Sequence, residues 1–87
     1  IYTNEGDADG ATITLPTAAA GLTYTFAVQA AQTLTVTANA GDTIRINGSV
    51  TAAAGSISSN VVGSTVTLTA INATEWLATA LVGTWSI

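Results

Sequence analysis

The acidic stretch near the N-terminus holds the residues with the clearest potential for chemistry. Glu5, Asp7 and Asp9 alternate ahead of Gly10, as oxygen ligands do in a calcium-binding loop. A complete EF-hand is excluded, because counting from Glu5 places Pro16 where that loop needs its bidentate acid. Two hypotheses follow for this stretch. It forms a looser calcium site, within one chain or shared between subunits, or it is an acidic connection that binds no ion.

The residue inventory argues against catalysis. The chain has no Cys and no His, and its one basic residue is an arginine, so the usual nucleophile and base pairs are missing. Asp7 and Asp9 are a conceivable glycosidase pair, but their spacing in a loop does not set the carboxyl separation of about 5 Å or about 6.5–9.5 Å that such enzymes need. We therefore expect a non-enzymatic protein with no cofactor apart from the calcium ion considered above.

The charge of the chain disfavours two classes of partner. Five carboxylates against one arginine give a net charge of -4, the wrong sign for binding nucleic acid or an anionic membrane surface through phosphates. The long uncharged segments alternate Thr with apolar residues, and Pro16, Gln29 and Gln32 interrupt one of them. This pattern is not that of a transmembrane helix. We expect neither nucleic acid nor membrane as a partner.

Arg45, the single basic residue, lies between Ile44 and Ile46. In a strand the two isoleucines face inward and Arg45 faces outward. Asp42 falls on the opposite face, so Glu75 or a carboxylate of a neighbouring chain is the better partner. We consider two roles for Arg45: an interface residue that sets the register between subunits, and an exposed residue that contributes only to solubility.

The aromatic residues suggest a second kind of site. Tyr24, Phe26 and Trp76 lie within apolar alternation and are expected in the core. Trp85 is expected to be partly exposed or to pack against a neighbouring chain, which makes it a candidate interface residue. Tyr2 and Trp85 together form the alternative hypothesis of a glycan-binding platform, since sugars stack on aromatic rings.

The elements that position these residues are predicted to be short strands. Apolar residues and Thr alternate with period two, which gives each segment one apolar face and one hydroxyl face. Glycine-containing turns separate the segments. We predict residues 1–10 as an acidic N-terminal connection and residues 11–87 as one all-β domain of antiparallel strands, arranged as a sandwich, a barrel or a prism. The predicted strands are 11–15, 22–28, 34–38, 43–46, 65–70, 76–81 and 84–87.

The predicted strands also suggest assembly. A domain of 87 residues buries only about 60–65% of its unfolded surface, and without Cys it has no disulfides to compensate. Edge strands are normally protected by Lys or by inward-pointing charge, whereas these segments carry Thr. We therefore expect the edges to be covered by other copies of the chain, although a Thr-rich face is also compatible with plain exposure to solvent.

Four segments, in order, carry a family resemblance: "ATITLPTAAAGLTYTF", "LTVTANAGDTIRI", "GSTVTLTA" and "EWLATALVGTW". Their order and spacing, from Ala11 to Trp85, resemble a module of tailed-phage and prophage virion proteins, including capsid decoration proteins, head fibres and tail-fibre segments. The resemblance implies an all-β, often trimeric component of the virion surface with no catalytic residues, in contact with proteins such as the major capsid protein.

Three functions are compatible with these observations. The first is a capsid decoration or fibre module that assembles as a trimer through β packing between copies. The second is a receptor-binding or glycan-binding domain at a fibre tip, which would use Tyr2 and Trp85. The third is a subunit of a cellular surface filament or adhesin.

Overall fold

Short strands make up all of the regular structure. The computed structural model describes residues 2–3, 6, 10–46 and 48–87, and within these residues it contains no helix. The all-β prediction is therefore confirmed. The strands are β1 (Tyr2–Thr3), β2 (Ala11–Thr14), β3 (Thr23–Ala27), β4 (Leu34–Thr37), β5 (Thr43–Ile46), β6 (Ser49–Val50), β7 (Ser56–Ser59), β8 (Thr65–Ala70) and β9 (Glu75–Val82).

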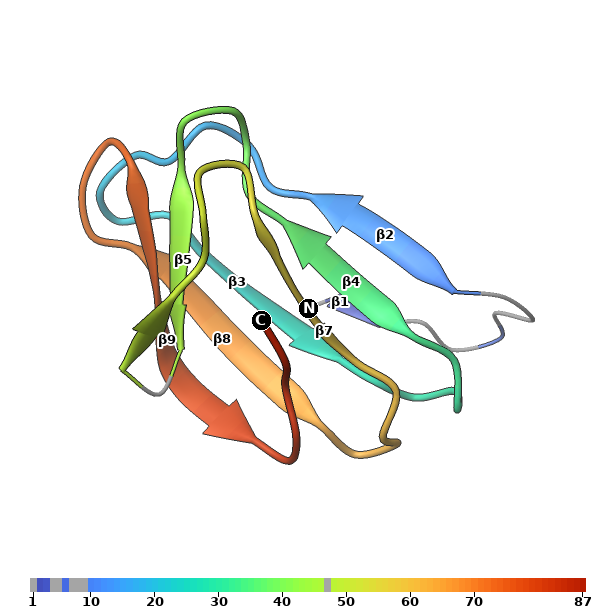
Figure 1. Ribbon diagram of the computed structural model, residues 1–87. Helices are drawn as coiled ribbons and strands as arrows, with labels where there is room; N and C mark the ends of the chain where they lie inside the picture. The colour runs from blue at the N-terminus through green and yellow to red at the C-terminus, as the bar shows by residue number, and fades with distance from the viewer. Residues whose placement is uncertain (1, 4–5, 7–9, 47) are drawn as a thin grey trace.

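The strands form two sheets that face each other across one core (Figure 1). The larger sheet has six strands in the order β1-β3-β8-β9-β5-β6, and the smaller has three in the order β2-β4-β7. The described strands close neither sheet into a barrel, so the architecture is an open two-layer sandwich.

The pairing directions differ in part from the antiparallel prediction. The pairs β1–β3, β2–β4 and β5–β9 are parallel, whereas β3–β8, β4–β7, β5–β6 and β8–β9 are antiparallel. The parallel pairs β1–β3 and β2–β4 arise because the first four strands alternate between the two sheets. A chain that crosses to the other sheet and returns runs again in its original direction, beside its own earlier strand.

The period-two alternation places the apolar residues between the sheets. Val66 and Leu68 of β8 and Leu34 and Val36 of β4 are all fully buried, and Ile57 of β7 joins them from the edge of the smaller sheet. The intervening Thr residues of β4 and β8 lie on the outer faces and are partly exposed. Burial of the alternating apolar side chains is what selects the register of these strands.

Strand β9 contains one irregularity that changes which of its residues face the core. Leu68 pairs with Ala78 and Thr67 pairs with Ala80, so Thr79 is an additional residue, as in a β-bulge. The bulge shifts the alternation by one position. As a result both Ala78 and Leu81 pack against the core, although they are three positions apart in the sequence.

The ends of the chain differ from the sequence prediction. Residues 84–87 were predicted as a strand, but only an isolated antiparallel bridge joins Ser86 to Ser58. Residues 2–3 fall within the predicted N-terminal connection, yet they form β1 and pair with β3. Strands β6 and β7 were not predicted, because two residues carry no periodic signal and the sequence of β7, SISS, is short and contains a single large apolar residue.

Candidate functional site

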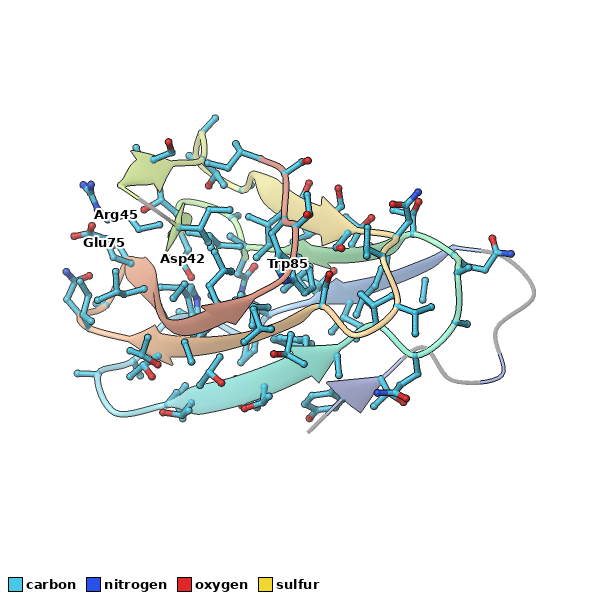
Figure 2. All side chains as sticks on the ribbon, turned by 90° about the horizontal axis from the view of Figure 1, so that it is seen from below. Asp42, Arg45, Glu75 and Trp85 are labelled. Carbon is cyan, nitrogen blue, oxygen red and sulfur yellow. The ribbon has the colours of Figure 1, made fainter. Side chains whose placement is uncertain are left out.

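Arg45 pairs with Glu75 within the chain, which is one of the two kinds of partner that the sequence left open for it (Figure 2). The Arg45 Nε atom lies 3.2 Å from Glu75 Oε2. The two strands are parallel, and Thr43 is opposite Glu75 while Arg45 is opposite Leu77, so the pair bridges neighbouring strands diagonally. Because both side chains are partly exposed, solvent screens this interaction.

Asn72, which the sequence did not single out as a site residue, completes this cluster. Its Nδ2 atom donates to Glu75 Oε1 over 2.9 Å, and its Oδ1 atom accepts a hydrogen bond from the Thr74 amide over 2.8 Å. The hydrogen bond from Asn72, followed by that from Arg45, lowers the pKa of Glu75 below its ordinary value of 4.5. The cluster therefore favours an ionised Glu75, whose charge Arg45 balances.

Asp42 does not belong to this cluster and instead holds two loops together. It is buried and its Oδ2 atom accepts a hydrogen bond from the Ala18 amide over 2.9 Å. Its main-chain oxygen accepts a second one from the Ala54 amide over 2.8 Å. The carboxylate thus ties the loop after β2 to the turn before β5, and Figure 2 shows it apart from the Arg45 and Glu75 pair.

The prediction that Trp85 is partly exposed is wrong. Its relative exposure is 8%, and it belongs to the hydrophobic core. The indole Nε1 atom donates a hydrogen bond to the main-chain oxygen of Thr65 over 3.1 Å, which locks the ring against β8. With its ring covered by its own chain, Trp85 offers little surface for stacking on a sugar or packing on a neighbouring copy.

Tyr2, by contrast, lies in an open aromatic groove between the two sheets. It is 46% exposed, and its ring stacks on Phe26 at a centroid distance of 5.5 Å and contacts Tyr24 at 6.0 Å. The groove has a volume of about 420 Å³. Among the described residues its lining is uncharged and consists of Tyr2, Ile13, Thr14, Leu15, Pro16, Tyr24 and Phe26. The sequence identified Tyr2 as a candidate but did not predict the contribution of β2 and Pro16.

The outer face of the six-stranded sheet is a surface of low net charge, because Arg45 and Glu75, which both lie on it, pair with each other. The hydroxyl groups of Thr23 and Thr69 form a hydrogen bond of 3.2 Å, and those of Thr25 and Thr67 form one of 3.1 Å. Continuing across the sheet, Leu77 lies opposite Thr69 and Arg45 lies opposite Leu77. Among the large apolar side chains that the structure describes, Val50 of β6 and Leu77 and Val82 of β9 are exposed on this face, at 45%, 36% and 57%.

The proposed calcium ligands Glu5, Asp7 and Asp9 lie outside the described residues. Within the described part of the chain, no group of three or more acidic, His or Cys residues comes together in a way that would hold a metal ion. Nor do those residues contain a helix that is long and apolar enough to span a membrane.

Comparison with known proteins adds no relative. No protein-family model matches the chain, and no match was found among curated proteins or among solved structures.

Proposed function

We propose that this protein is a non-enzymatic structural component of a tailed-phage virion, a capsid decoration or fibre module at the virion surface, and that it assembles as a trimer. Two arguments support the proposal. The first is the order of the motifs between Ala11 and Trp85, which resembles such modules. The second is the character of the outer surface of the larger sheet, which suits contact with other copies better than chemistry on a small molecule.

The observation that carries the proposal is the outer face of the six-stranded sheet. Val50, Leu77 and Val82 are exposed there among Thr side chains, and the charges of Arg45 and Glu75 neutralise each other. A surface of this kind loses little on desolvation, because it contains few groups that water solvates strongly. Burying its apolar area contributes about 25 cal/mol per Å², which favours association of copies.

Light scattering on the purified chain in dilute neutral buffer tests the trimer. We expect a mass that is a multiple of three times 8.6 kDa. The double variant Leu77→Lys and Val82→Lys places charge on the outer face and should reduce the mass threefold. The matched control, Val61→Lys and Val62→Lys, alters two apolar residues of the β7–β8 loop that are as exposed, at 48% and 56%, and should leave the mass unchanged.

Two further measurements complete this test. Adding a calcium chelator to the same sample tests the Glu5, Asp7 and Asp9 hypothesis, since dissociation on chelation would make calcium part of the assembly. Mass spectrometry of purified phage particles tests the virion location. A folded monomer at all concentrations would contradict the proposal.

A second candidate function, glycan recognition at a fibre tip, is favoured by the exposed ring of Tyr2 in the aromatic groove. Aromatic rings beside hydroxyl groups, here those of Tyr2, Tyr24 and Thr14, are suited to stacking on a sugar and bonding its hydroxyls. A glycan array with the wild type and Tyr2→Ala tests this function. Saturable binding that Tyr2→Ala abolishes and Val61→Ala preserves would support it, and no binding by the wild type would contradict it.

A further inference from the structure

Strand β2 has an unpaired edge. It is the outermost strand of the smaller sheet, and among the described strands only β4 lies beside it (Figure 1). The amides of Ala11 and Leu15 donate to the oxygens of Thr33 and Thr37 in this parallel pairing. Since alternate residues of a strand direct their main-chain groups to opposite sides, those of Thr12 and Thr14 face the open edge.

This edge lacks the features that normally prevent pairing between molecules. The side chains of Thr12 and Thr14 are exposed and uncharged, and β2 contains neither Lys nor Pro nor a bulge in its pairing with β4. The other edges are different. Strands β1 and β6 are only two residues long, and main-chain hydrogen bonds of 2.9 and 2.8 Å join Ser58 of β7 to Ser86. Strand β2 is thus the longest edge in the described structure without such protection.

The edge is also complementary to a second copy of itself. If a two-fold axis passes beside Ile13, Thr12 of one subunit lies opposite Thr14 of the partner subunit, and Thr14 lies opposite Thr12 of the partner subunit. Both residues direct an amide and a carbonyl outward, so each such pair exchanges two hydrogen bonds in an antiparallel ladder. The outer faces of the two smaller sheets then form one continuous face, because Thr12 and Thr14 are already in register with Thr35 and Thr37 of β4.

From this geometry we propose that two copies of the chain pair through β2 in antiparallel register and form one continuous six-stranded sheet from their smaller sheets. The partner is a second copy, because β2 (Ala11–Thr14) contains no charged residue and its edge satisfies its own hydrogen-bonding pattern. The pairing also places a second subunit at the mouth of the aromatic groove, whose wall includes Ile13 and Thr14 of β2 and the exposed ring of Tyr2.

This inference rests on the proposed function in one respect, since it assumes that the protein assembles with copies of itself. The contact is separate from the outer face of the larger sheet, which carries the proposed trimer contact. An assembly with both contacts joins trimers in pairs, and its mass is a multiple of six subunits.

Two double variants of β2 test the pairing and its register. In Thr12→Lys with Thr14→Lys, antiparallel pairing places lysines opposite each other at both positions, which opposes association. In Thr12→Lys with Thr14→Glu, the same register places each Lys opposite a Glu. We expect the first variant to have half the mass of the wild type by light scattering and the second to keep the full mass. Far-UV circular dichroism and the fluorescence of the buried Trp76 and Trp85 establish that both variants are folded.

The outcomes separate this inference from the proposed function. An unchanged mass in the first variant overturns pairing through β2 but leaves a trimer through the larger sheet intact. Loss of half the mass in both variants overturns the antiparallel register. A wild-type monomer overturns the inference and the proposed function together, whereas a dimer that is insensitive to Leu77→Lys with Val82→Lys supports the inference alone.

Discussion

Replacing Gly83 by Ala should destabilise the protein strongly, because two separate effects combine at this residue. Gly83 follows β9 and has a φ of 82°, in the left-handed region that costs other residues about 1–2 kcal/mol. A Cβ atom at this position would also lie 2.9 Å from both Cα and Cβ of Ser64. Overpacking of this kind typically costs about 1–3 kcal/mol, so the total is about 2–5 kcal/mol.

Ser64 has little freedom to relieve this contact. It is buried, its amide donates to the Val61 oxygen over 3.0 Å, and its own oxygen accepts from the Val28 amide over 2.9 Å. A domain of this length has a total stability of roughly 4–13 kcal/mol, at roughly 0.05–0.15 kcal/mol per residue. The substitution therefore removes a large share of the free energy of unfolding.

Urea unfolding followed by tryptophan fluorescence measures this effect, with Gly21→Ala as the matched control. Gly21 has a φ of 97°, but a Cβ atom there meets nothing within 4 Å. The Gly21→Ala variant should therefore lose only the free energy that the backbone conformation costs, about 1–2 kcal/mol. Both variants are compared with the wild type at one protein concentration, since association changes apparent stability. Equal losses in the two variants would refute the argument that Ser64 causes the additional cost.

Three further predictions concern single side chains. Trp85→Phe should destabilise the protein more than Trp76→Phe by about 0.5–1.5 kcal/mol in urea unfolding, because the Trp85 indole donates a hydrogen bond whereas that of Trp76 has no partner among the described residues. The reverse order would contradict the role of that bond. Asp42→Ala should cost about 1–3 kcal/mol, since it leaves a buried amide unpaired, and Asp42→Asn, which keeps an acceptor, should recover most of the loss. The hydrogen bond from Asn72 helps to lower the pKa of Glu75 in the folded protein below its ordinary value of 4.5. The stability that Glu75 contributes is therefore fully present above pH 4.5, and it is lost as the pH falls through the lower pKa of the folded state. Urea midpoints measured from neutral to acidic pH should show a smaller loss in Glu75→Gln than in the wild type, and identical profiles would contradict this assignment.

Residue alternation predicted much of the secondary structure and narrowed the choice of partner for Arg45. The strands around Val36, Ile44 and Leu68 were expected because one apolar face must be buried, and the structure confirms them. The same argument placed Arg45 outward, away from Asp42, and left Glu75 or a carboxylate of a neighbouring chain as its partner, of which the structure shows Glu75. Side-chain direction follows from position along a strand, which makes this level of structure readable from local sequence.

The arrangement of the strands was not accessible in this way. Alternation specifies which face of a strand is buried, but it does not specify which strand lies beside it or in which direction, and both crossover and hairpin connections satisfy the same pattern. The parallel pairs, the unprotected edge of β2 and the bulge at Thr79 therefore appear only in the folded chain. Trp85 shows the same limit, because its position near the end of the chain suggested exposure, whereas the fold buries it in the core and brings its indole within hydrogen-bond distance of Thr65, twenty residues away.

The sequence by itself thus determined an all-β chain with few charged residues, apolar inner faces, hydroxyl outer faces and one outward-facing cation, because these properties depend only on composition and on alternation along each strand. Only the tertiary structure decided which faces and edges stay open. Those are set by contacts between residues distant in sequence, such as Tyr2 with Phe26 in the groove and β2 with β4 at the free edge.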